Sequence, residues 1–194
     1  KLGGEADDSR EIASKQAFVD SLRSAAPDAF LVDEAVTTKQ ALLTRWPLDR
    51  AGYLANKGGG LGFGLPAAVG AAIAESEEGT GRDVVAVVGD GSYLYYPQTV
   101  YSAVRYDVDV TVVVPDNRNY RILKDNTVQI MGGEESDYDF VGMDFDPHVD
   151  IPENARSHGA RAWLVTDPDE LAGTFQDAIA VDGPAVVDAL VHDG

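Results

Sequence analysis

The stretch VVAVVGDGS, residues 84–92, decides the fold class of this chain. Its first five residues are apolar and mostly β-branched, as in a strand that is buried on both faces. Gly89 and Gly91 predict a sharp turn at the carboxyl end of that strand, where the backbone can approach a ligand closely. Ser92 and the amides after it predict the start of a helix, whose dipole favours an anion.

Short apolar runs of the same kind recur along the chain and alternate with helical patterns. We predict strands at 30–32, 53–55, 84–88, 110–114, 162–165 and 185–190, and helices at 14–26, 38–45, 65–74, 97–106 and 168–180. Valine-rich strands that alternate with helices predict an α/β fold, a doubly wound, mostly parallel sheet of about six strands with helices on both faces. The segment 131–152 shows little periodicity and is expected to cross the surface as an irregular excursion.

The length of the chain indicates a single domain. A chain of 194 residues is enough for one sizeable α/β domain and too short for two of that size. Residues 1–13 are polar and are expected to be a linker or tail, and residues 14–194 form the expected domain. Ser14 has the residue type and the position of a helix N-cap.

The charge excludes several classes of partner. The net charge is −18, from 33 acidic and 15 basic residues, and the acids are scattered over the whole chain. Such a surface repels nucleic acid and anionic lipid, so we expect neither a nucleic-acid nor a membrane partner. The scattered acids are expected to form an acidic surface suited to a salt-rich, halophilic cytoplasm, where screening removes most self-repulsion. The sequence contains no cysteine, which excludes a disulfide framework and a thiolate metal site.

Two polar turns follow neighbouring strands of the predicted sheet. Asp90 follows the strand 84–88, Asn117 follows the strand 110–114, and 26 residues lie between the two. That distance fits one helix and one strand, so the two side chains are expected to meet at the carboxyl edge of the sheet. A carboxylate beside an anion site requires a divalent cation between them, and Mg²⁺ prefers oxygen ligands of these types.

Two other interpretations remain open at this point. Gly-Asp-Gly is also common as an ordinary structural turn. The glycine-rich run 58–64 follows the predicted strand 53–55 and could be a dinucleotide loop, which needs glycines directly after a strand. A nucleotide- or phosphate-binding module without catalysis, or a scaffold, would explain that run but would leave Asp90 and Asn117 unexplained.

The two motifs together resemble the signature of thiamine diphosphate (ThDP)-dependent enzymes, which begins with Gly-Asp-Gly and closes with Asn-Asn. The run GGGLGFGLPAA at 58–68 is similar to the corresponding stretch of the benzoylformate decarboxylase and acetolactate synthase group. The likeness continues through DPDEL at 167–171 and PAVV at 184–187 and covers nearly the whole domain. This resemblance implies the ThDP-binding fold and, for this chain, the C-terminal, diphosphate-binding half of such an enzyme.

The resemblance also implies a metal site. In that family the aspartate of Gly-Asp-Gly and the second asparagine of the pair bind Mg²⁺, which correspond to Asp90 and Asn117. The third protein ligand is a backbone carbonyl, here that of Asn119. The sequence departs from the family at Asp116, where the first asparagine is expected, and at Arg118, where a small residue is usual. Arg118 either offsets the charge of Asp116 or faces solvent.

The expected cofactor contacts share one edge of the sheet. Gly91, Ser92 and Tyr120 are expected at the diphosphate, and Leu61 is expected to hold the cofactor in its bent shape. The remaining contacts implied by the resemblance are the carbonyl of Gly59, toward the aminopyrimidine, and the hydroxyl of Thr37.

No catalytic residue is expected in this chain. The family's activating glutamate belongs to a pyrimidine-binding domain, which nothing in this sequence resembles, so it is expected on another part of the polypeptide or on another chain. The predicted function is a ThDP-dependent decarboxylase of 2-oxo acids, benzoylformate decarboxylase-like, with an acetolactate synthase-like carboligase as the alternative. A cofactor held between two domains predicts a homo-oligomer, a dimer or a tetramer.

Overall fold

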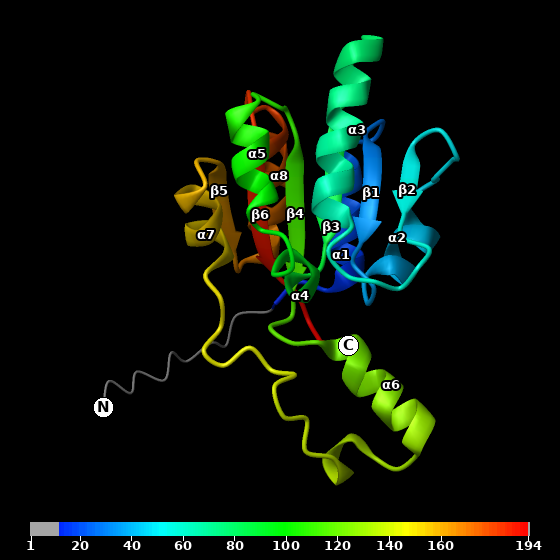
Figure 1. Ribbon diagram of the computed structural model, residues 1–194. Helices are drawn as coiled ribbons and strands as arrows, with labels where there is room; N and C mark the ends of the chain where they lie inside the picture. Colours follow the sequence, from blue (N-terminus) through cyan, green and yellow to red (C-terminus); the bar gives the residue numbers. More distant parts are fainter. Residues whose placement is uncertain (1–11, 194) are drawn as a thin grey trace.

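The computed structural model describes residues 12–193 and contains one sheet of six parallel strands (Figure 1). The spatial order of the strands is β2-β1-β3-β4-β6-β5. The strands are β1 Phe30–Glu34, β2 Tyr53–Ala55, β3 Val84–Val88, β4 Thr111–Asp116, β5 Arg161–Val165 and β6 Ala185–Leu190. The helices are α1 Lys15–Ala25, α2 Lys39–Arg45, α3 Gly64–Glu78, α4 Asp90–Tyr93, α5 Thr99–Arg105, α6 Arg121–Met131, α7 Ile151–Ser157 and α8 Leu171–Ile179, with short 3-10 turns η1 Glu135–Asp137 and η2 Pro168–Glu170. The α/β fold class predicted from the sequence is confirmed.

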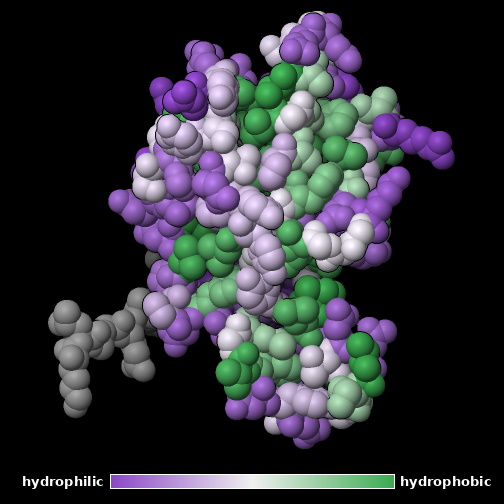
Figure 2. Space-filling view, in the orientation of Figure 1, coloured by the Kyte–Doolittle hydropathy of each residue, from purple (hydrophilic) through white to green (hydrophobic). Residues whose placement is uncertain are grey.

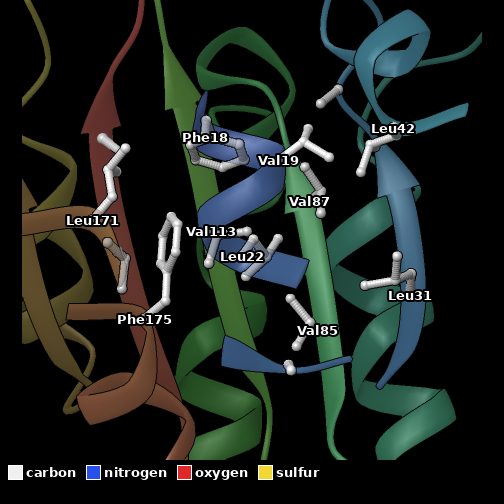
Figure 3. Close-up of a cluster of buried hydrophobic side chains, with 14 of the residues drawn as sticks. Phe18, Val19, Leu22, Leu31, Leu42, Val85, Val87, Val113, Leu171 and Phe175 are labelled. Atoms are coloured by element: carbon white, nitrogen blue, oxygen red, sulfur yellow. The ribbon is translucent and has the colours of Figure 1, made fainter. Parts of the chain in front are cut away.

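Successive residues of the central strands point alternately to the two faces of the sheet. On β3, Val85 and Val87 lie in the core beneath α1, α2 and α8, whereas Val84, Ala86 and Val88 lie in the core beneath α3, α5 and α7. Figure 3 shows the first core, where Phe18 of α1 and Phe175 of α8 meet over the sheet. Their rings are 5.3 Å apart in an edge-to-face arrangement. Burial on both faces explains why these strands are continuous apolar runs.

The strand order reverses between β1 and β3. The chain leaves β1 toward β2 on one side, returns through α3 and then adds β3 on the other side of β1. The helices α2 and α3 consequently cover opposite faces, and a crevice opens between the carboxyl ends of β1 and β3. In open α/β sheets this reversal is the usual place of a ligand site.

Several boundaries differ from the predicted ones. The strand β4 extends to Asp116 because its pairing with β6 continues through Pro115↔Ala189 and Asp116↔Leu190, so these residues belong to the strand and not to the turn. The helix α3 continues four residues beyond the predicted end and stops at Gly79, which adopts a left-handed conformation. Tyr93, three residues after Asp90, is fully buried in the core.

Two helices were not predicted. The helix α6 extends away from the sheet (Figure 1), and of its residues only Lys124 is buried. The helix α7 begins at the end of the segment 131–152, which is otherwise largely irregular as predicted. Asp150 caps α7 by accepting a hydrogen bond from the amide of Glu153 at 2.8 Å.

The expected tail falls partly outside the described residues. Residues 1–11 of that tail lie outside the described residues. Ala13, placed in the tail by the sequence, is buried and pairs with Val191 beside the end of β6. Within residues 12–193 no helix is long and apolar enough to cross a membrane. Figure 2 shows strongly hydrophilic residues around most of the outline of the face in view, with apolar residues between them.

Ser14 is the N-cap of α1, as predicted, and its hydroxyl accepts a hydrogen bond from the amide of Ala17 at 3.1 Å. Replacing Ser14 by alanine is expected to lower the free energy of unfolding by about 1 kcal/mol, because the amide loses its partner. Ser24→Ala is the matched control, since the Ser24 hydroxyl only donates back to Asp20 within the same helix. Urea unfolding of both variants tests this, and an equal effect of the two would contradict it.

Candidate functional site

A small pocket of about 40 Å³ lies at the carboxyl ends of β1, β3 and β4, at the reversal of strand order. Seven of the eight residues predicted to bind the cofactor line it, together with Asn119. They are Thr37, Leu61, Asp90, Gly91, Ser92, Asn117 and Tyr120. Gly59, the eighth, lines an adjoining pocket, and the two pockets share Glu34, Ala35, Val36 and Leu61.

Two buried oxygen atoms in this pocket have no hydrogen-bond partner among residues 12–193. They are Oδ2 of Asp90 and Oδ1 of Asn119, and both residues are buried. The other carboxylate oxygen of Asp90 accepts a hydrogen bond from the amide of Gly91 at 2.8 Å. Unpartnered buried oxygens are costly unless something compensates them, and a divalent cation with oxygen ligands would do so. The donor set therefore fits Mg²⁺.

The side chain of Asp193 orients the side-chain amides of Asn117 and Asn119. Their Nδ2 atoms donate to Oδ1 of Asp193, at 2.8 Å from Asn117 and 3.0 Å from Asn119. Nδ2 of Asn119 also donates to the carbonyl of Asn117 at 2.8 Å. With the nitrogens so engaged, the amide oxygens are the atoms left to bind a cation. The sequence-based expectation named the backbone carbonyl of Asn119, and the side-chain oxygen of the same residue is a further candidate ligand.

Three buried aspartates lie at or near the carboxyl ends of the neighbouring strands β3, β4 and β6. They are Asp90, Asp116 and Asp188, and each is at most 6% exposed. Burial and the carboxyl group of Asp116 raise the pKa of Asp90 to about 8. Burial and the charges of Asp116 and Asp90 raise the pKa of Asp188 to about 8 as well. The sequence did not single out Asp188, because a lone acid within an apolar strand gives no sign of its neighbours across the sheet.

The departures at Asp116 and Arg118 have a local structural explanation. The backbone amide of Arg118 donates to Oδ1 of Asp116 at 2.7 Å, in a turn where Arg118 has φ 59°. The Arg118 side chain is exposed. Of the two readings left open by the sequence, the side chain therefore faces solvent, and it is the backbone of Arg118 that binds Asp116.

Gly91 is required by the aromatic ring that lies against it. A Cβ atom at this position would lie 2.3 Å from Cε1 and 2.6 Å from Cδ1 of Tyr120. The ring also packs edge to face on Phe145, with centroids 4.8 Å apart.

Gly91→Ala is accordingly expected to displace Tyr120 and to lower the free energy of unfolding by about 1–3 kcal/mol through overpacking. Gly70→Ala is the matched control: it lies within α3 with open space around the added methyl, and it should stabilise the chain by about 0.5–1 kcal/mol. Thermal unfolding of the two variants measures the difference. A Gly91 variant as stable as the wild-type chain would contradict this account of the glycine.

One residue at the pocket was missed by the sequence analysis. Glu34, the last residue of β1, is 4% exposed, and its carboxylate accepts hydrogen bonds from the amides of Phe63 and Gly64 at 3.0 and 2.7 Å. The partners are about 30 residues away in sequence, so no local motif announces the contact.

A larger cavity, of about 370 Å³, lies at the opposite end of the sheet. Its charged residues include Glu75 and Arg82, which form an ion pair with each other. The amino ends of parallel strands are not where ligands bind in such folds, and we assign the functional site to the smaller pocket.

The pocket lies within a stretch that matches a known family. Residues 38–189 match the thiamine pyrophosphate enzyme, C-terminal TPP-binding domain. The chain belongs to this family. Thiamine pyrophosphate is another name for ThDP, so both the family resemblance and the cofactor predicted from the sequence are confirmed.

Individual relatives of this TPP-binding domain are enzymes of the expected group. Benzoylformate decarboxylase of Pseudomonas aeruginosa is 33% identical over 162 residues, 83% of this chain and 29% of that protein. Acetolactate synthase isozyme 3 large subunit of Escherichia coli is 29% identical over 167 residues, 84% of this chain and 28% of that protein. The structure of benzoylformate decarboxylase from Polynucleobacter necessarius superposes with a TM-score of 0.84 and 29% identity, covering 98% of this chain and 35% of that one.

The chain thus spans 28% to 35% of the length of these relatives. The comparisons establish the family and the fold, and they do not distinguish a decarboxylase from a carboligase.

Proposed function

We propose that this chain is the diphosphate-binding domain, residues 14–194, of a ThDP-dependent 2-oxo-acid decarboxylase resembling benzoylformate decarboxylase. The observation that carries the proposal is the pair of unpartnered buried oxygens on Asp90 and Asn119, in a pocket at the carboxyl edge of the sheet. When bound, the cofactor supplies the carbanion chemistry at the substrate carbon, and the protein supplies orientation and electrostatics.

In this proposal Asp90, Asn117 and Asn119 hold Mg²⁺, and the metal neutralises the diphosphate so that an acidic protein can bind it. Gly91, Ser92 and Tyr120 contact the diphosphate. Leu61, Gly59 and Thr37 contact the organic part of the cofactor.

The proposal also includes a second domain and a paired assembly. Binding of the aminopyrimidine and its activation by a glutamate are assigned to a pyrimidine-binding domain of the same or another polypeptide, in a cytoplasmic homo-oligomer. Support for such a contact comes from apolar side chains left exposed on α6 and beyond it, where Ile130, Met131 and Val141 are each at least 71% exposed. Figure 2 shows apolar residues at the surface of this lower part of the molecule.

A nucleotide-binding module is disfavoured by Glu34. In a dinucleotide loop the amides at the start of the helix bind the pyrophosphate. Here the corresponding amides of Phe63 and Gly64 bind the Glu34 carboxylate, which places a negative charge where a phosphate would have to lie.

The proposal is tested by calorimetric titration of ThDP into the chain in molar KCl, once with Mg²⁺ and once with EDTA. Binding that requires the metal is the expected result. Absence of metal-dependent binding of both ThDP and inorganic diphosphate would contradict the proposal, and ATP binding insensitive to EDTA would favour the nucleotide module.

An acetolactate synthase-like carboligase is the second candidate, favoured by the match to the Escherichia coli large subunit over 84% of this chain. The chain combined with its pyrimidine-binding domain distinguishes the two. Release of CO₂ and benzaldehyde from benzoylformate supports the decarboxylase, whereas formation of acetolactate from pyruvate supports the carboligase.

A further inference from the structure

Glu34 connects the two loops that make up the pocket. Its backbone carbonyl accepts hydrogen bonds from the amide of Gly89 at 3.4 Å and from the hydroxyl of Ser92 at 3.3 Å, on the diphosphate side. Its carboxylate accepts hydrogen bonds from the amides of Phe63 and Gly64, where the glycine-rich loop 58–62 enters α3. One buried residue therefore contacts both halves of the proposed cofactor site.

The helix α3 depends on this residue for its cap. Phe63 is the N-cap, its side chain offers no hydrogen bond, and the first turn contains no acid. The Glu34 carboxylate takes that role from a neighbouring strand, where a negative charge also interacts favourably with the helix dipole. Gly64 permits the close contact, because a Cβ there would lie 2.9 Å from Cγ2 of Val88 and 3.0 Å from Cβ of Glu34.

The first part of the glycine-rich loop has little else to hold it within the described residues, whereas Gly62 at its end lies against Tyr95 and Tyr96. Gly58, Gly59 and Gly60 are exposed, and a chain of glycines loses much conformational entropy when it is ordered. The Asn56 side chain braces the beginning of the loop by bonding the amide of Gly58 and the carbonyl of Gly60. Glu34 braces its end, and Leu61 lies between the two braces.

We propose that Glu34 is a positioning residue of the cofactor site, whose carboxylate holds Leu61 and Gly59 in a fixed place relative to Asp90. The inference rests on the proposed function. It adds a residue whose carboxylate does not itself contact the cofactor. Placement within about half an ångström is what a binding constellation requires, so a loosened loop weakens binding of the organic half of the cofactor. The diphosphate half, held by the turn after β3, is independent of the carboxylate.

The experiment compares two ligands in Glu34→Gln by calorimetry with Mg²⁺. The glutamine amide presents an NH₂ group to a backbone N–H, so one of the two bonds is lost while the size of the side chain is kept. We expect the affinity for ThDP to fall about tenfold and the affinity for inorganic diphosphate to change less than about twofold. Glu34→Asp, which keeps the charge on a shorter side chain, is measured alongside in case the glutamine variant does not fold.

Glu75→Gln is the matched control. Glu75 is 8% exposed, lies on the same helix as the capped amides but near its other end, and bonds Arg82 and Thr80 there. Both variants are expected to lower stability, but Glu75→Gln should leave the affinities for both ligands within about twofold of wild type.

A second measurement needs no cofactor. Lys57 is exposed at the start of the loop, and trypsin cleavage after it reports how often the loop opens. We expect cleavage at Lys57 about tenfold faster in Glu34→Gln and unchanged in Glu75→Gln.

The outcomes distinguish a failure of the role proposed for Glu34 from a failure of the proposed function. Equal weakening of ThDP and diphosphate, no weakening of either, or equal cleavage rates in the two variants would overturn the role of Glu34. If the wild-type chain bound neither ligand, the proposed function would fail, and the trypsin comparison would still decide whether Glu34 holds the loop.

Discussion

We expect Asp90→Asn to abolish Mg²⁺-dependent binding of ThDP and, at the same time, to make the metal-free chain more stable. Both effects follow from the removal of one buried charge. Asparagine has the same shape as aspartate, so the pocket is kept. The affinity in calorimetry should fall about a hundredfold or more, because the charged ligand of the cation is lost. At pH 8 the free energy of unfolding in EDTA should rise by about 1–3 kcal/mol, because an uncompensated buried carboxylate is removed.

Asp188→Asn is the matched control for this experiment. Asp188 is as deeply buried as Asp90, its pKa is raised to a similar value, and it does not line the pocket. It should stabilise the metal-free chain by a similar amount and leave ThDP binding unchanged. Loss of binding in both variants would show that the whole aspartate cluster, and not Asp90 as a ligand, is responsible.

The stability of the metal-free chain should fall as the pH rises from 5 to 8. The pKa values of Asp90 and Asp188 are raised from the usual 3.8 to about 8, so the folded chain binds more protons than the unfolded chain between these values. Their contribution is fully present below about pH 4 and is lost as the pH rises through 8. We expect a loss on the order of 3 kcal/mol over this range, measured by urea unfolding in EDTA and molar KCl.

The double variant Asp90→Asn with Asp188→Asn isolates this effect. Hydrogen-bonded acids such as Asp20 and Glu75 have pKa values lowered by Arg45 and by Arg82, respectively, and they act in the opposite direction, below about pH 4. The wild-type chain should lose stability between pH 5 and 8, whereas the double variant should be nearly flat. Addition of Mg²⁺ should restore stability at pH 8 by binding only the folded chain. Parallel pH profiles of the two proteins would contradict the assignment of the raised pKa values.

Features whose signals lie within a few neighbouring residues were predicted correctly from the sequence, whereas features that depend on distant residues were not. The buried strand at 84–88 and the cap at Ser14 were predicted because their signals lie within a few residues. The helix α6 was missed although its apolar residues lie at helical spacing; in the fold it extends away from the sheet, and of its residues only Lys124 is buried. The end of β4 was misplaced because Pro115 and Asp116 look like a turn but pair with β6, a strand about 75 residues later.

The sequence by itself determined the fold class, the family and the residues proposed to bind the diphosphate and its metal. It could do so because alternating β and α patterns and a loop motif after a strand are local properties of the chain. Only the tertiary structure decided that Asp188 joins Asp90 and Asp116, that Tyr120 lies against Gly91, and that Glu34 caps α3. These contacts join segments that the parallel sheet brings to one edge, and burial there, which no local pattern encodes, is what raises the pKa values and leaves the two oxygens unpartnered.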